Sequence, residues 1–227
     1  MKLLEQYSYR TEHSWRPQPT ISSEESLQFY GVSFSWGEID LSQKAFENIR
    51  IFVEASLNQS EVTNPFGFNE GLSSLENALY SGCSQANDVI HRLINSMALT
   101  SGLEGVWIVK KAKELALIQI GQPQVYLIRK HSIIPLFSIT DIISSTPNNG
   151  LFLPNKLLGV HSKTHYNIQS INFESSDELI LLAHSLVPLG LIESSKSQVA
   201  ERGKLLFSTI AKEYPLCPFW ISRFKFE

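Results

Sequence analysis

The stretch LALIQIGQPQVYLIR, residues 115–129, decides the fold. It contains two β-rich runs that meet at a Gly-Gln-Pro sequence, and a third such run, GVWIVKKA, precedes them. The connections between the three runs, near Lys113 and at Gln122-Pro123, are too short for a helical crossover. The pattern therefore predicts three strands within residues 105–130 that form an antiparallel meander.

Two helical patterns precede these strands. Apolar residues recur every three to four positions in 40–59 and again in 72–99, which predicts two amphipathic helices. Gly82 lies inside the second pattern and either breaks the helix or allows close packing. The other predicted elements are strands at 27–36, 166–174, 177–184 and 219–227, a short helix at 138–146, and a helix at 196–214. This order favours one α+β domain spanning 1–227, with residues 1–26 as an irregular arm or an edge strand.

Composition excludes several classes of function. A hydrophobic fraction of 43% and a charged fraction of 18% are typical of a globular chain. The net charge of -3 gives no basic footprint, so we expect no nucleic-acid partner. The longest apolar stretch, 179–192, contains His184 and Pro188 and is too short to span a membrane. Two cysteines form no disulfide framework, and the N-terminal residues lack the pattern of a signal peptide, so we expect a cytoplasmic protein.

Three segments together resemble the metal-dependent protein phosphatases of type 2C. One family strand reads approximately l.v.nvGDSRaYLyR, and residues 115–129 match it at Gly121, Tyr126, Leu127 and Arg129. A later family segment reads GDrLLLcSDGL. The matching segment here is SDELILLAHSL, which keeps Asp177, the aliphatic run and Leu186. A helix motif, aN..i before mgTT, corresponds to Ala86, Asn87, Ile90 and MALTS at 97–101.

The resemblance covers approximately residues 27–226 and implies an α/β/β/α sandwich, in which two antiparallel sheets pack face to face between helices. It also implies phosphoester hydrolysis by a water held between two Mg²⁺ or Mn²⁺ ions. Hard cations of this kind require several oxygen ligands, and the family supplies aspartates. Each of these acidic positions can be checked against the sequence.

Four acidic positions of the family carry other residues in this chain: Phe34, Gln122, His184 and, in the terminal motif, Cys217 beside Pro218. Asp40 lies close to the first position, but we expect it to cap the following helix. The N-terminal R..NED motif has no clear counterpart, since Arg10 is at most a remnant. The resemblance therefore implies a degenerate, pseudophosphatase-like domain with no metal site and no cofactor.

We predict that this domain is not an enzyme and acts by protein–protein recognition, as a scaffold, competitor or regulator of a protein partner. Two alternatives stay open: a divergent metal-dependent serine/threonine phosphoprotein phosphatase, and a module that binds a ligand or phosphopeptide without hydrolysis. We expect Phe34 and Trp36 to fill the former cleft, with a contact surface as the alternative.

Several polar residues have two interpretations each. We expect His184 to be a polar residue at a strand end, but with His161 and His165 it could form a zinc site. The thiol of Cys217 or Cys83 is expected to be a core or near-core group, with a Cys/His nucleophile pair as the alternative. Lys110, Lys111 and Lys113 are interpreted as a solvated hairpin end or, alternatively, as a partner patch.

Overall fold

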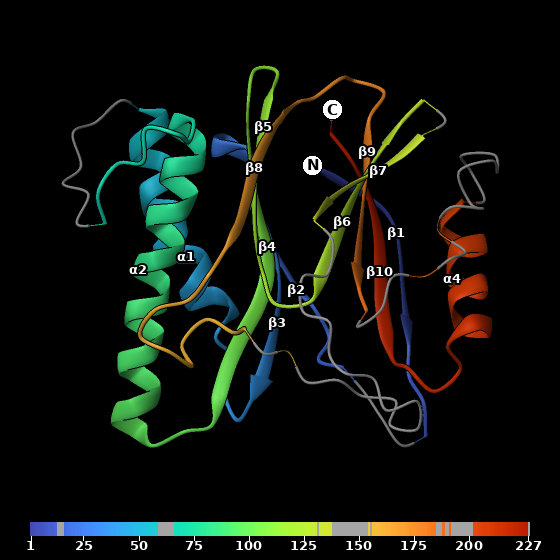
Figure 1. Ribbon diagram of the computed structural model, residues 1–227, viewed down its shortest axis with the longest axis horizontal. Coiled ribbons are helices and arrows are strands. Elements are labelled where there is room, and N and C mark those ends of the chain that lie inside the picture. Colours follow the sequence, from blue (N-terminus) through green and yellow to red (C-terminus); the bar gives the residue numbers. More distant parts are fainter. Residues whose placement is uncertain are drawn as a thin grey trace. The chain divides into compact units, whose positions relative to one another are not determined.

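The computed structural model describes residues 1–12, 16–58, 66–130, 132–137, 154, 156–184, 188, 191 and 202–226. Its chain divides into two compact units, which are described separately below (Figure 1). Unit 1 comprises Met1–Gln18, Gln122–Leu153 and Glu174–Glu227, and unit 2 comprises Pro19–Gly121 and Pro154–Phe173. The expectation of one domain over the whole chain stays a prediction.

Unit 2 contains a five-stranded antiparallel sheet in the order β2-β3-β4-β5-β8. Its strands are β2 (Thr20–Glu24), β3 (Phe29–Gly37), β4 (Ser101–Lys111), β5 (Glu114–Ile120) and β8 (Asn167–Asn172). A short 3-10 helix, η1 (Glu25–Leu27), connects β2 to β3. Helices α1 (Ser42–Leu57) and α2 (Ser74–Met97) lie against one face of this sheet (Figure 1).

The two helices of unit 2 pack closely on each other and on the sheet. Their apolar faces join those of β3, β4 and β5 in one buried cluster around Ile49, Leu79 and Trp107. A Cβ atom at Gly82 would lie 2.8 Å from the Cα of Ile49, so this glycine permits close helix packing and does not break α2. A capping box formed by Ser73 and Glu76 fixes the start of α2.

Unit 1 contains the second five-stranded antiparallel sheet, in the order β1-β10-β9-β6-β7. Its strands are β1 (Lys2–Tyr9), β10 (Phe219–Lys225), β9 (Glu178–Ala183), β6 (Pro123–Arg129) and β7 (Ser132–Phe137). Helix α4 (Arg202–Glu213) covers one face of this sheet (Figure 1). Its Leu206 and Ile210 belong to the same buried cluster as Ile180 and Ile221 of the sheet.

Two antiparallel sheets with flanking helices confirm the predicted α+β fold class. The predicted meander is wrong at its second turn, because β5 pairs with β4 and β8, while β6 pairs with β7 and β9. Gly121, at a φ of 84°, carries the chain from one sheet to the other at this point. The edge-strand alternative for 1–26 agrees with β1 and β2, each at an edge of its sheet. The helix expected at 138–146 lies outside the described residues.

Candidate functional site

The residue that the resemblance places at the first acidic position of the phosphatase motif is a core residue. Phe34 on β3 is fully buried. Phe29 belongs to the helix-side core, and because side chains alternate along a strand, Phe34 points to the opposite face of the sheet. A buried phenyl ring offers no oxygen to a cation and instead fills space.

Trp36 and Glu104 lie beside Phe34 and form a polar pair at this end of the sheet. The backbone register places Glu104 opposite Phe34, and the indole Nε1 of Trp36 donates to Glu104 Oε1 at 3.0 Å. Glu104 is fully buried, whereas Trp36 keeps part of its side chain in solvent. Sequence reasoning missed Glu104; its one signal was a lone acid between Leu103 and Gly105 in an otherwise apolar run.

Gln122, which the resemblance places at the second acidic position, is held by an arginine from a distant part of the chain. Arg16 Nη1 donates to Gln122 Oε1 at 2.8 Å, and both side chains are buried. A guanidinium beside this position repels any cation that the amide oxygen might otherwise bind, because like charges interact strongly where little water screens them. Arg16 was also missed, because a single arginine in a polar, proline-containing segment carries no pattern.

The third position, His184, lies at the same end of its sheet as Gln122. Pro123 and Ala183 are direct neighbours in the β6–β9 ladder, so the residues next to them share one strand end. The imidazole of His184 is fully buried, with ring centroids of Tyr214 at 5.0 Å and Phe219 at 5.8 Å. The side chain is therefore part of an aromatic cluster on the α4 side of the sheet.

The backbone around His184 is fixed by β6. Gln124 Nε2 donates to the carbonyl oxygen of His184 at 2.9 Å, and the hydroxyl of Tyr126 donates to Gln124 Oε1. His161 and His165, the other members of the suggested zinc site, are exposed residues of unit 2. The described residues contain no group of three His, Cys, Asp or Glu side chains arranged to hold a metal ion.

Cys217, at the predicted fourth position, and Asp40, close to Phe34 in the sequence, have local roles. The backbone N–H of Cys217 donates to the carbonyl oxygen of Tyr214 at 3.1 Å, which closes a turn between α4 and β10. Burial raises the pKa of the Cys217 thiol and that of Cys83, so less thiolate forms than in a free cysteine, and neither has the low pKa of an activated nucleophile. Asp40 Oδ1 accepts from the N–H of Ser42 at 2.9 Å. The expected N-cap role of Asp40 is wrong by one residue, because the N-cap of α1 is Leu41, which has no side-chain capping hydrogen bond.

The solved structures most informative about this arrangement are bacterial phosphatases, although no family model and no curated protein sequence matches the chain. PppA, a key regulatory component of T6SS in Pseudomonas aeruginosa, aligns with a TM-score of 0.65 at 12% identity, over 98% of this chain and 96% of that chain. The Mycobacterium tuberculosis serine/threonine phosphatase PstP/Ppp aligns with a TM-score of 0.60 at 15% identity, over 98% of both chains. MsPP from Mycobacterium smegmatis, a PPM Ser-Thr phosphatase in complex with cacodylate, aligns with a TM-score of 0.63 at 13% identity, over 100% of both chains. The chain has a phosphatase 2C-like fold.

The residues at the four substituted positions do not fit the metal ions that this phosphatase 2C-like fold implies. Mg²⁺ and Mn²⁺ require a set of oxygen ligands with negative charge. At these positions the chain has the buried phenyl ring of Phe34 and the amide of Gln122, which is hydrogen-bonded to a guanidinium. The other two positions have the imidazole of His184, packed against aromatic rings, and the half-buried thiol of Cys217. No catalytic step through a metal ion is therefore derived from them.

The motif residues that match the phosphatase pattern stabilise the sheet of unit 1. Asp177 is fully buried and accepts from Arg129, with Nε at 3.0 Å from Oδ1 and Nη2 at 2.6 Å from Oδ2. The same carboxylate accepts from the backbone N–H of Glu174 at 2.8 Å, which fixes the turn before β9. This pair connects the end of β6 to the start of β9, so these residues have a structural role that involves no metal ion.

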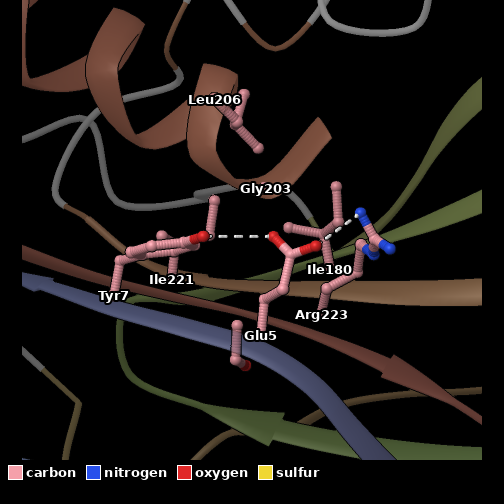
Figure 2. A pocket seen from close by; sticks show the side chains of 8 residues that line it. Glu5, Tyr7, Ile180, Gly203, Leu206, Ile221 and Arg223 are labelled. Atoms are coloured by element: carbon pink, nitrogen blue, oxygen red, sulfur yellow. Dashed lines mark hydrogen bonds and ion pairs between the residues drawn. The ribbon is translucent and has the colours of Figure 1, made fainter. Parts of the chain in front are cut away.

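A small pocket in unit 1 lies under the first turn of α4 (Figure 2). Its lining residues are Glu5, Tyr7, Ile180, Gly203, Leu206, Ile221, Ser222 and Arg223. Arg223 bridges two carboxylates, with Nη1 at 3.2 Å from Glu5 and Nε at 3.2 Å from Glu178. The pocket has room for about one water molecule. Its charged groups pair with one another, so we interpret it as the attachment of α4 to the sheet.

The helices of the described residues include none that is both long enough and apolar enough to span a membrane.

Proposed function

We propose that this chain is a degenerate, catalytically inactive member of the type 2C phosphatase family that acts by recognising a protein partner. The contact between Arg16 and Gln122 carries the proposal, because it puts a buried positive charge where the family motif has an aspartate. Phe34 supports it independently, since a fully buried phenyl ring has no oxygen atom that could coordinate Mg²⁺ or Mn²⁺.

Protein recognition is the role that this fold supports without metal chemistry. The chain keeps the pair of Arg129 with the buried Asp177 that stabilises the fold, while the positions that the resemblance assigns to hydrolysis carry other side chains. PppA, one of the similar structures, is a regulatory component of its secretion system. By analogy, the proposed role is that of a cytoplasmic scaffold, competitor or regulator whose partner is a protein and not a nucleic acid.

Calorimetric titration of Mn²⁺ into the purified chain, with hydrolysis of p-nitrophenyl phosphate followed in the same samples, tests the proposal. We expect no binding heat, no turnover and no shift of the thermal midpoint, because a ligand stabilises only a protein that binds it. MsPP, treated identically, is the positive control. Binding of about two ions with Mn²⁺-dependent turnover would contradict the proposal and support the divergent phosphatase instead.

A further inference from the structure

Residues 159–166, here called the basic loop, run along α2 and are attached to it by two polar side chains. Asn87 Oδ1 accepts from the N–H of Gly159 at 2.9 Å, and Asn87 Nδ2 donates to the carbonyl oxygens of His161 at 3.0 Å and Ser162 at 3.2 Å. His91 Nδ1 lies 2.8 Å from the carbonyl oxygen of Gly159. A carbonyl can only accept, so Nδ1 carries the proton of this bond.

The two ends of the basic loop are fixed as well. Gly159 has a φ of 90°, and a Cβ atom there would lie 2.3 Å from Ile90 Cγ2, so the backbone lies directly on α2. At the other end, the hydroxyl of Tyr166 donates to the carbonyl oxygen of Cys83 at 3.2 Å, and its ring meets Tyr80 edge to face. The backbone of the basic loop is therefore held in one conformation before any partner binds.

Between these ends the basic loop exposes a set of hydrogen-bond donors: His161, Ser162, Lys163 and His165. The loop itself carries no acidic residue, and neither does the following strand β8. On α2, the nearby acid Asp88 forms an ion pair with Arg92 at 3.6 Å. In the part of the chain that the structure describes, no carboxylate forms an ion pair with Lys163, so its charge is available to a partner.

We infer that the basic loop binds a phosphorylated segment of the partner protein, an inference that rests on the proposed recognition function. A phosphate group accepts at three oxygens and carries close to two negative charges, which matches an ammonium, a hydroxyl and two imidazoles on one short loop. An imidazole donates a hydrogen bond in either protonation state. Because the backbone is already ordered, less conformational entropy is lost on binding than for a free loop.

Fluorescence anisotropy with the full chain and a labelled phosphoserine peptide tests the inference. The same peptide with serine, and with glutamate, in place of phosphoserine serves as the comparison. We expect the triple variant His161→Ala/Lys163→Ala/His165→Ala to weaken phosphopeptide binding by about tenfold or more, since hydrogen bonds to charged groups are lost. The matched control is Lys110→Ala/Lys111→Ala/Lys113→Ala at the β4–β5 hairpin, which removes more positive charge and should leave binding nearly unchanged.

Asn87→Ala tests the attachment of the loop without removing any of its donors. We expect the affinity to fall severalfold while its dependence on salt concentration stays unchanged, because the charges that contact the phosphate are the same. His91→Ala removes a different attachment of the loop. Its affinity for the phosphopeptide provides an independent test if Asn87→Ala reduces the folded fraction. Unchanged affinity in both folded variants would contradict the role of the fixed backbone.

Four outcomes would overturn the inference: equal affinity for the phosphorylated and unphosphorylated peptides, equal affinity for the glutamate peptide, equal weakening in the hairpin variant, or equally tight binding of vesicles containing anionic lipid. Failure of the inference is distinguishable from failure of the proposed function. If the chain shows neither peptide binding nor Mn²⁺-dependent turnover, the phosphopeptide inference is rejected and the proposal of an inactive domain stands. Mn²⁺-dependent turnover would instead contradict the proposal of an inactive domain.

Discussion

Gly82 occupies a contact between α1 and α2 that admits no side chain. Its added Cβ would lie 2.8 Å from Ile49 Cα and 3.0 Å from Ile49 O, and backbone atoms cannot rotate away as a side chain can. In an open helix, Gly→Ala is stabilising by up to about 1 kcal/mol. At this site we expect Gly82→Ala to lower the free energy of unfolding by about 1–3 kcal/mol, because the two helices must separate.

Urea denaturation of the purified variants measures this effect. Ser96→Ala, at an exposed position of the same helix, is the matched control and should change stability by less than about 0.5 kcal/mol. A Gly82→Ala variant as stable as the wild type would mean that α1 and α2 can separate at little energetic cost.

At the residue scale, the sequence assigned residues to the acidic positions of the motif but did not predict their environments. Phe34, Gln122 and His184 could be found because each stands at a fixed place in a strand motif. Arg16 could not, because it reaches Gln122 across 106 residues of chain, and a contact between distant residues leaves no local pattern. Glu104 was missed for a related reason: its polar partner, Trp36, lies on the neighbouring strand.

The end of α2 offers a prediction at the scale of an element. Ala98 follows the helix with a φ of 53°, and Leu99 N donates to the carbonyl oxygen of Ile94 at 3.1 Å, which is a Schellman-type helix end. This left-handed conformation disfavours a residue with a Cβ atom by about 1 kcal/mol. Ala98→Gly should therefore raise the free energy of unfolding by about 0.5–1 kcal/mol, measured by thermal and urea denaturation.

The control for Ala98→Gly is Ala211→Gly inside α4, which should be destabilising by about 1 kcal/mol because glycine is a poor helix former. If both variants lost stability, the left-handed geometry at Ala98 would not be the determining factor.

The Arg129–Asp177 pair gives a second prediction for an element, the β6–β9 connection. Asp177 is fully buried and receives hydrogen bonds from Nε and Nη2 of the guanidinium, so Arg129→Met would leave a buried carboxylate without its charged partner. We expect a loss of about 3–5 kcal/mol in the free energy of unfolding. Hydrogen exchange should show that the amides of β9 lose protection first.

A surface arginine provides the comparison for this pair. Arg50 on α1 contacts Glu47 and Glu54, whose side chains are 47% and 45% exposed, and exposed pairs contribute little. Arg50→Met should lower stability by less than about 1 kcal/mol. Equal effects of Arg129→Met and Arg50→Met would show that burial of Asp177 is not what makes its pair strong.

The elements themselves were largely predictable from periodicity, and the errors have physical causes. Helices α1 and α2 follow from apolar spacing, and β9 and β10 from apolar runs near turn residues. The pairing of β6 was predicted wrongly because a short connection favours a hairpin, whereas here Gly121 redirects the chain to another sheet. Strand β7 was not predicted because Pro135 interrupts it, and an edge strand tolerates that proline.

For the whole molecule, the fold and the chemistry associated with it depend on different residues. The apolar runs and the Arg129–Asp177 pair stabilise the sheets and need no metal ion. The positions that would hold metal ions contribute to folding in other ways, since Phe34 is buried in the core and His184 joins an aromatic cluster. The residues that stabilise this phosphatase 2C-like fold are therefore different from those at the positions where the resemblance implies metal ligands.

Buried tyrosines make the stability of the whole molecule sensitive to high pH. Burial raises the pKa of Tyr126 to about 12, and burial together with Glu213 raises that of Tyr214 to about 12, from an ordinary value of 10.0. Burial also raises the pKa of Tyr30 and Tyr166. Because the folded state disfavours the phenolate, the unfolded chain loses these protons at lower pH than the folded chain does.

The sign of the effect follows from this difference in pKa. Below about pH 10 both states keep their phenolic protons, and the tyrosines cause no pH dependence. Above it the unfolded state releases protons first, so the free energy of unfolding falls between about pH 10 and about pH 12. Tyr126 alone accounts for a loss on the order of 2–3 kcal/mol by the upper end of this window. The urea concentration at the midpoint of unfolding should fall as the pH is raised through this window, and phenolate absorbance should rise as the protein unfolds. Tyr126→Phe should reduce the slope, whereas a slope unchanged in that variant would show that Tyr126 ionises freely in the folded protein.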